Sequence, residues 1–201
     1  MAAPVQFYFD FASPYGYLAS TQIDTLAERH GRSVDWHPML LGAVFKVTGG
    51  QPLTGIPIKG DYTGHDLLRF ARFLDVPFRM PDPMPMHSVA AARAYYWREQ
   101  EEGPGPAKVL AKAIFHAHFG EGRDLSRPEA IAELADAAGL DSKAMLDGMQ
   151  SQNVKDRLRA VTDEGIGKGV FGSPFVIVDG EGFWGADRLD QVERWLATGG
   201  W

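Results

Sequence analysis

Apolar residues recur with two different spacings over the first forty positions. Residues Val5–Phe9 form a short run of β-branched and aromatic side chains, which predicts a buried strand. From Pro14 the apolar residues fall three or four positions apart until Gly31, which predicts one helix that ends at this glycine. In segment 33–38 the alternate residues Val34, Trp36 and Pro38 are apolar, which predicts a second strand. Together these elements predict a βαβ unit with adjacent parallel strands and a right-handed crossover.

The middle of the chain alternates between irregular and helical patterns. The segment 40–47 is apolar with a single cation, Lys46, and the stretch 48–64 is rich in glycine and proline. This composition predicts an irregular loop that carries Lys59. The prolines of segment 79–85 exclude a helix there. Helices are predicted over 67–74, 87–102, 107–119, 126–138, 141–149 and 153–165.

The last part of the chain returns to strand patterns. Residues Phe175–Val178 are β-branched and apolar and predict a strand, followed by a hairpin turn over 179–182. The return strand is predicted to start at Phe183, and a final helix over 189–196 is predicted to have Asp187 as its N-cap. The predicted order is therefore β-α-β, a long helical block, then β-β-α.

Composition removes several functional classes. The net charge of -6 over 201 residues provides no basic surface, which argues against nucleic acid as a partner. No apolar run approaches the ~20 residues that span a membrane, and residues 1–4 do not resemble a signal peptide, so we expect a cytoplasmic protein. The chain has no cysteine, and no spaced set of histidines predicts a metal site. Any sulfur chemistry would therefore need a thiol carried by a small molecule.

The turn between the first strand and the first helix is the best candidate for chemistry. Ser13 is a favoured N-cap residue, and Pro14 fits the first helical position because its missing N–H has no helical partner there. Such a helix start presents a hydroxyl group and unpaired N–H groups, which attract an anion or a thiolate. The alternative is that Ser13 is only a helix cap.

The element order, with a special turn after the first strand and a proline before the third, resembles the thioredoxin-like arrangement. The long helical block resembles the insertion found in the DsbA branch of that superfamily. Within this branch, four segments closely resemble 2-hydroxychromene-2-carboxylate isomerases, with kappa-class glutathione transferases as near relatives. These segments are 7–18, 40–46, 169–175 and 183–189.

The resemblance implies an α/β, thioredoxin-like fold with a large all-helical insertion. Residues 1–40 and 166–201 would form the thioredoxin-like domain, and residues 41–165 the inserted loop and helical domain. The implied activity is the glutathione-dependent interconversion of 2-hydroxychromene-2-carboxylate and trans-o-hydroxybenzylidenepyruvate in aromatic catabolism. The alternatives are a kappa-like glutathione transferase and a non-catalytic binding module. The implied partners are a small aromatic carboxylate and a second copy of the chain.

The resemblance also assigns site residues. Ser13 would be catalytic and would hydrogen-bond the glutathione thiolate, while the backbone of Ser173, before a proline expected to be cis, would bind the cysteinyl unit. The remaining glutathione contacts would come from Trp184, Gly185, Ala186, Asp187 and Lys59. Substrate contacts would come from Lys46, Phe11 and Tyr15.

Each of these assignments has an ordinary structural alternative. Lys46 and Lys59 are also explained as surface lysines, Ser173-Pro174 as a plain turn, and Asp187 as a helix cap. The aromatic residues Phe11, Tyr15 and Trp184 are also explained as core residues. Two positions depart from the family pattern, because Gly50 and His87 stand where many relatives have asparagine.

Overall fold

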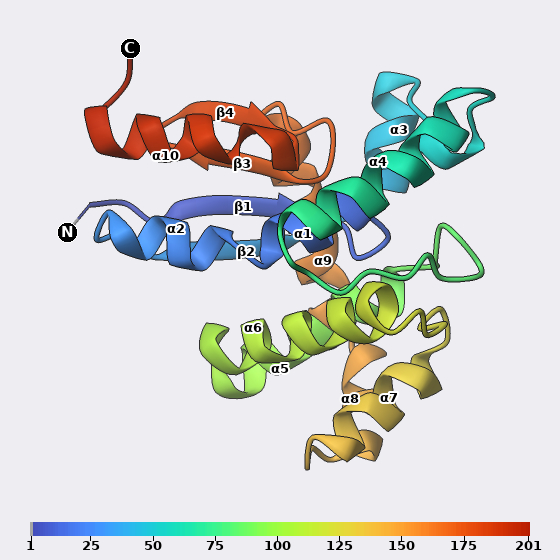
Figure 1. Cartoon of the computed structure of the whole chain (residues 1–201). Helices are drawn as coiled ribbons and strands as arrows, with labels where there is room; N and C mark the ends of the chain where they lie inside the picture. The colour runs from blue at the N-terminus through green and yellow to red at the C-terminus, as the bar shows by residue number, and fades with distance from the viewer. Residues whose placement is uncertain (1) are drawn as a thin grey trace.

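The computed structural model describes residues 2–201, and a four-stranded mixed sheet lies at its centre (Figure 1). The strand order is β2-β1-β3-β4. The strands are β1 Val5–Phe9, β2 Val34–Pro38, β3 Phe175–Val178 and β4 Glu181–Trp184. β1 is parallel to β2, whereas β3 is antiparallel to both β1 and β4. The predicted pair of adjacent parallel strands is confirmed.

Ten helices and three shorter helical turns surround the sheet within residues 2–201. The helices are α1 Pro14–Ser20, α2 Ile23–Arg29, α3 Leu41–Thr48, α4 Lys59–Phe73, α5 Val89–Glu102, α6 Pro104–Phe115, α7 Pro128–Ala137, α8 Ser142–Met149, α9 Gln152–Gly167 and α10 Leu189–Thr198. The shorter turns are η1 Leu53–Gly55, the π-helical η2 His116–Gly120 and η3 Ala186–Arg188. Along the chain, the helices α3 to α9 all come after β2 and before β3. This order confirms a thioredoxin-like fold with a helical insertion.

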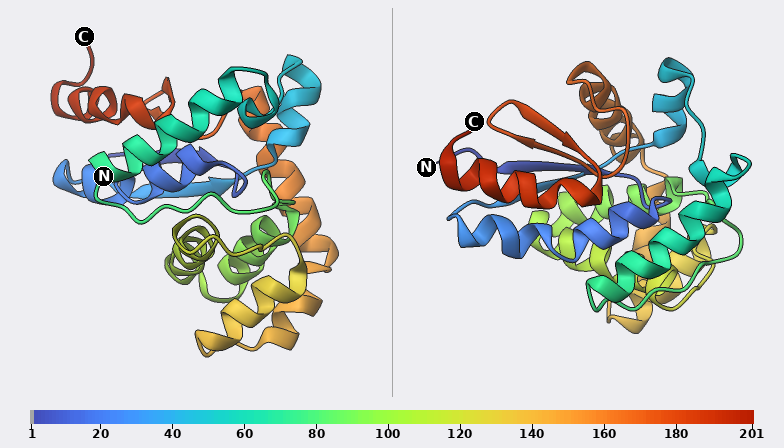
Figure 2. Two further views of the ribbon diagram at one scale, coloured as in Figure 1. Left: turned by 45° about the vertical axis from the view of Figure 1, so that its right-hand side comes forward. Right: turned by 45° about the horizontal axis from the view of Figure 1, so that its top comes forward.

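The two faces of the sheet are covered by different helices (Figure 2). On one face Phe9 packs against Phe115 of α6, and Phe183 packs against Trp195 of α10. On the other face the ring of Tyr8 lies against Gly165 of α9. Because both faces are covered, β1 is buried along almost its whole length, as expected for a central strand that reads as a continuous apolar run.

The first predicted helix is two helices, α1 and α2. The break falls at Thr21 and Gln22, where the hydroxyl groups of Ser20 and Thr21 donate to the carbonyls of Tyr17 and Leu18. Hydroxyl groups that bond nearby backbone compete with the helical pattern. The apolar spacing continues through this break, so a prediction from spacing alone misses it.

The loop predicted over 48–64 is partly wrong. Helix α4 begins at Lys59, eight residues before the first apolar residue of its predicted stripe, and η1 precedes it. Gly60 is one of the glycines on which the loop prediction rested. A Cβ atom at this position would lie 2.5 Å from the carbonyl oxygen of Thr54 in η1. The glycine therefore permits close packing of α4 on η1 and does not mark a flexible loop.

The hairpin and the final helix differ in detail from the prediction. The turn consists of Asp179 and Gly180, whose φ angles of 52° and 94° fit a two-residue type I′ turn. Asp187 lies inside η3, and the N-cap of α10 is Arg188, so the predicted cap role of Asp187 is wrong. Among the helices of residues 2–201, none combines the length and the apolar character needed to cross a membrane.

Candidate active site

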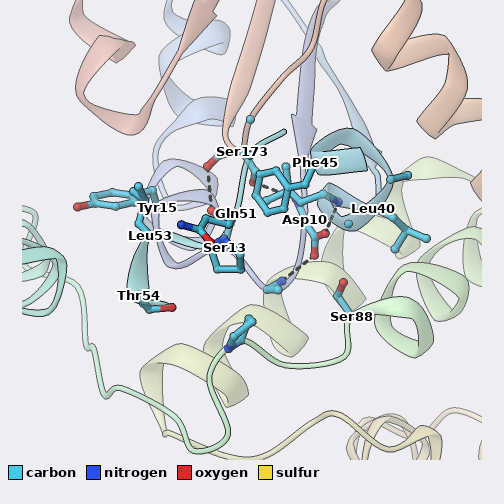
Figure 3. Close-up of a pocket in the computed structure, with 18 of the residues that line it drawn as sticks. Asp10, Ser13, Tyr15, Leu40, Phe45, Gln51, Leu53, Thr54, Ser88 and Ser173 are labelled. Atoms are coloured by element: carbon cyan, nitrogen blue, oxygen red, sulfur yellow. Dashed lines mark hydrogen bonds between the residues drawn. The ribbon is translucent and has the colours of Figure 1, made fainter. Parts of the chain in front are cut away.

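A cavity of about 1010 Å³ opens at the carboxyl end of β1 (Figure 3). Its walls come from the start of α1, the segment from α3 to η1, the residues leading into α5 and the loop before β3. Most wall residues are apolar. They include Leu41, Phe45, Phe171 and Trp184. A deep apolar cavity with a few polar groups on its floor is the usual form of a small-molecule site.

Ser13 lies on the floor of this cavity as the N-cap of α1. Its Oγ accepts a hydrogen bond from the N–H of Gly16 at 3.0 Å, and its hydroxyl donates to the carbonyl of Ser173 at 2.9 Å. The residue is 6 % exposed. The cap bond and the bond to a distant loop hold the Ser13 oxygen in place on the floor of the cavity.

The loop before β3 meets the α1 turn directly. The peptide bond Ser173-Pro174 is cis, as the family resemblance implied. The Oγ of Ser173 accepts a hydrogen bond from the backbone N–H of Asp10 at 2.9 Å. Gly16 permits this approach, because a Cβ atom there would lie 3.0 Å from the Ser173 Oγ. The structure therefore brings together two motifs that stand 160 residues apart in the chain.

Asp10 is a polar residue of the cavity that the sequence did not assign to the site. It is 3 % exposed, and its carboxylate accepts hydrogen bonds from the N–H groups of Ala12 at 2.8 Å and Leu41 at 2.7 Å. Burial raises the pKa of this carboxyl, while hydrogen bonds from Ser88, Ala12 and Leu41 oppose the rise. The available sequence signal was a lone carboxylate directly after an apolar strand.

Tyr15 lines the cavity, but its hydroxyl is engaged elsewhere. The hydroxyl donates to the Oδ2 of Asp66 on α4 at 2.6 Å, and in Figure 3 it points away from Ser13. Burial, together with the hydrogen bond to Asp66, raises the pKa of Tyr15 well above its ordinary range. The part of Tyr15 offered to a ligand is therefore its ring.

The other predicted substrate residues lie in different places. Lys46 is exposed in the last turn of α3 and lines the cavity. Phe11 is 1 % exposed and packs on Phe9 and Phe115, with ring centroids 5.2 Å and 4.9 Å away. Phe11 does not line the cavity, so its predicted role as a substrate residue is wrong, and it is a core residue. The chain turns directly after β1, and Phe11 continues the aromatic cluster below the turn.

The residues predicted to bind the ends of glutathione are only partly at the cavity. Trp184 lines the cavity and is 53 % exposed. Its ring packs edge-on against Phe171, with the ring centroids 4.9 Å apart. Gly185, Ala186 and Asp187 follow Trp184 but do not line the cavity, and Asp187 pairs with Arg188 at 2.7 Å. Lys59 is exposed at the start of α4, also outside the lining. Gly50 and His87 both line the cavity, so the two departures from the family pattern fall on its wall.

Two residues on the floor of the cavity have backbone N–H groups without a protein acceptor in the described part of the chain. Among residues 2–201, no protein acceptor is bonded to the backbone N–H of Tyr15 in the first turn of α1, or to that of Ser173. Both residues line the cavity together with Ser13. An anionic sulfur and a peptide carbonyl are groups that such donors accommodate. The described chain contains no group of three or more His, Asp or Glu side chains placed to share a metal ion.

The fold and this floor define a class of protein, a thioredoxin-like protein whose turn after the first strand carries Ser13 and no cysteine. The family described as the DSBA-like thioredoxin domain matches residues 4–197, and the chain belongs to this family. It is 30 % identical to a 2-hydroxychromene-2-carboxylate isomerase of Sphingobium xenophagum, over 98 % of this chain and 99 % of that protein.

Two further comparisons extend the likeness. The chain is 32 % identical to glutathione S-transferase kappa 2 of Caenorhabditis elegans, over 96 % of this chain and 91 % of the relative. A solved structure of 2-hydroxychromene-2-carboxylate isomerase superimposes with a TM-score of 0.84 at 27 % identity, covering 96 % of this chain and 94 % of the other. The relatives are therefore isomerases and transferases, which are two kinds of enzyme.

Proposed function

We propose that this protein is a glutathione-dependent isomerase that interconverts 2-hydroxychromene-2-carboxylate and trans-o-hydroxybenzylidenepyruvate in the breakdown of aromatic compounds. The observation that carries the proposal is the Ser13 hydroxyl, hydrogen-bonded to Ser173 on the floor of a large apolar cavity. The name of the Sphingobium relative supports the choice of reaction.

Glutathione, when bound, would supply the nucleophilic thiolate that a chain without cysteine lacks. The chain's own part is to favour the anionic form of that sulfur. The Ser13 hydroxyl carries one proton, which it now donates to the Ser173 carbonyl. Because a hydroxyl proton rotates about its C–O bond, Ser13 can turn this donor toward an anion beside it while its oxygen keeps the Gly16 cap.

The rest of the cavity is suited to an aromatic carboxylate. Lys46 lies on the wall and offers a cation for the carboxylate. The rings of Tyr15, Phe45 and Trp184 also line the cavity and offer apolar faces to an aromatic ligand. We assign Lys46 and Tyr15 as substrate residues on this basis, and we do not assign Phe11.

The remaining glutathione contacts are part of the same proposal. The free N–H of Ser173 would bind the cysteinyl unit, and the segment from Trp184 to Asp187 would bind the γ-glutamyl end. Packing of α1 on η3 keeps this segment near Ser13. Lys59 would meet the glycyl carboxylate from the start of α4, a helix tied to α1 by the bond between Tyr15 and Asp66.

The proposal includes a cytoplasmic location and a homodimer. Support for a second copy comes from apolar side chains that the monomer leaves in solvent, above all Ile58 at 84 % exposure and Phe73 at 82 %. Sedimentation equilibrium of the full chain tests the assembly. A monomer at all concentrations would contradict this part of the proposal without affecting the reaction.

Ring opening of 2-hydroxychromene-2-carboxylate, followed by absorbance with and without glutathione, tests the reaction. The isomerase proposal predicts enzyme-dependent product only when glutathione is present, with no glutathione consumed. The same rate in its absence would overturn the proposal.

A kappa-like transferase is the second candidate, because the Caenorhabditis relative is named as one. A transferase would consume glutathione and form a conjugate in proportion to the substrate lost. Mass spectrometry of the same reaction mixtures therefore separates the two candidates, since an isomerase leaves the glutathione concentration constant.

A further inference from the structure

Asp10 is a buried carboxylate of the cavity for which the proposed reaction has no use. Its Oδ1 accepts the N–H of Ala12 at 2.8 Å, and its Oδ2 accepts the N–H of Leu41 at 2.7 Å. Its own backbone N–H donates to the Oγ of Ser173 at 2.9 Å. A carboxylate with both oxygens engaged by backbone donors is fixed in place and is a poor general base.

Helix α3 has few buried side chains to hold it in place. Of its eight residues only Val44 is buried, although Phe45 and Lys46 both form part of the cavity wall. A short helix with one buried side chain opens easily unless its ends are anchored. The position of this wall therefore depends on the backbone that leads into the helix.

Three consecutive N–H groups anchor that backbone to the end of β1, to α9 and to the turn after β1. The N–H of Met39 donates to the carbonyl of Phe9 at 2.8 Å, and the N–H of Leu40 donates to the Oγ1 of Thr162 at 3.3 Å. The N–H of Leu41 donates to the carboxylate of Asp10 at 2.7 Å. The Leu41 bond is the shortest of the three and the only one with a carboxylate acceptor. Hydrogen bonds to an ionised acceptor are roughly twice as strong as neutral ones.

We infer that Asp10 is a positioning residue whose carboxylate fastens the first N–H of α3 to the turn that carries Ser13. The bond keeps Phe45 and Lys46 on the cavity wall, while the other carboxylate oxygen of Asp10 accepts from Ala12 and its backbone N–H donates to Ser173. The inference deepens the proposed isomerase and rests on it only for its kinetic test, because the bond itself is measured without any reaction.

Leu41→Pro removes this hydrogen bond while leaving Asp10 in place. Leu41 is the first residue of α3, where a proline ring and its missing N–H are tolerated. The preceding residue, Leu40, is already extended with φ −106° and ψ 106°, as a residue before proline requires. Leu41→Ala is the matched control, because it removes the same side chain and keeps the N–H.

Amide hydrogen exchange gives the first readout and needs no substrate. Leu41→Pro should speed exchange of the α3 amides about tenfold relative to Leu41→Ala. Exchange in β1 and β3 should stay the same in both variants. Folded Asp10→Ala protein should show the same faster exchange in α3, because this variant removes the acceptor of the bond whereas Leu41→Pro removes the donor. Equal α3 exchange in Leu41→Pro and Leu41→Ala would overturn the inference.

A double-mutant cycle with Lys46→Met separates positioning from plain stability. In the otherwise native chain, Leu41→Pro should lower kcat/KM about tenfold relative to Leu41→Ala, mainly through KM. In the Lys46→Met background the same change should cost less than about threefold, because the displaced lysine is already absent. Equal losses in both backgrounds would mean a purely structural bond and would overturn the positioning role. If the unaltered protein opens no chromene ring, the isomerase proposal fails, and amide exchange still decides the role of Asp10.

Discussion

Ser13 combines a structural and a chemical role in one hydroxyl group. Its oxygen caps α1 by accepting a hydrogen bond from the Gly16 N–H, and its O–H donates a hydrogen bond to the Ser173 carbonyl. The cap bond uses only the oxygen, so the proton is free to be redirected without loss of the cap. This separation of acceptor and donor allows one residue to close a helix and to stabilise an anion.

Ser13→Ala should therefore affect turnover far more than stability. Loss of an N-cap costs about 1 kcal/mol in the free energy of unfolding, whereas loss of a positioned donor lowers kcat by about a hundredfold. Ser151→Ala is the matched control, because Ser151 caps α9 through the N–H of Val154 and lies outside the cavity lining. Urea unfolding and steady-state kinetics on both variants test this. Equal kinetic losses would remove Ser13 from the mechanism.

The burial of Asp10 predicts a pH dependence of stability. A carboxyl whose pKa is higher in the folded state than in the unfolded chain binds its proton more readily when folded. Its contribution to stability is therefore fully present below the unfolded pKa and is lost as pH rises through the folded pKa. Asp10→Asn removes this titration. The unfolding free energy of the native protein minus that of the variant should increase as pH falls from 7 toward the ordinary carboxyl pKa of about 4.

Among residues 2–201, no charged side chain contributes to the raised pKa of Asp10. The titratable side chains that line the same cavity are Tyr15 on α1, Lys46 on α3 and His87 before α5, and none of them contributes to the raised pKa of Asp10. Asp24→Asn is a useful contrast. Burial alone would raise the pKa of Asp24, but Lys112 and Lys108 lower it overall, so the native-minus-variant difference should decrease as pH falls. A difference for Asp10 that is constant or grows with pH would contradict the account.

The sequence indicated Ser13, Ser173 and Trp184 for the cavity but could not separate Phe11 from Tyr15. Both are aromatic and both stand beside Ser13, yet one is in the core and the other on the wall. The chain turns between them, so strand alternation does not say which way either ring faces. Asp10 and Asp66 were missed because their partners lie 31 and 51 residues away.

At the scale of elements, apolar spacing predicts that a helix exists better than it predicts where the helix ends. α5 and α9 were found almost whole, while α1 and α2 were merged and the start of α4 was missed. The errors occur where side-chain hydroxyl groups or close glycine contacts decide the backbone. Such contacts depend on neighbours in space, which spacing along the chain does not contain.

Two helical glycines should respond in opposite directions to alanine. In α8, a Cβ atom at Gly148 would lie 2.0 Å from the ring of Trp97, so Gly148→Ala should destabilise the protein by about 1–3 kcal/mol. In α4, a Cβ atom at Gly64 meets nothing within 4 Å, so Gly64→Ala should stabilise it by about 0.5–1 kcal/mol. Thermal or urea unfolding measures both. A stabilising Gly148→Ala would contradict the contact of α8 with Trp97 of α5, and a destabilising Gly64→Ala would contradict the open space beside α4.

At the scale of the whole molecule, strand order creates the site. β3 is the antiparallel neighbour of β1, so the end of one lies beside the start of the other. This pairing places the Ser13 turn against the Ser173 loop, and the helical insertion then supplies α3 and the start of α5 as further walls. The apolar runs predicted the strands themselves. The pairing of β1 with β3 was not among the predictions, since two apolar strands carry no label for their partners.

The central claim is that the Ser13 turn stabilises the thiolate of bound glutathione. The most direct test is the ultraviolet absorbance of the thiolate, titrated with pH for glutathione bound to the native protein and to Ser13→Ala. Since the chain has no cysteine, the thiolate signal comes from glutathione alone. The account predicts a bound thiol pKa well below the ordinary value of about 8.5, which returns toward that value in Ser13→Ala. A bound thiol that titrates at its ordinary pKa in the native protein would contradict the claim.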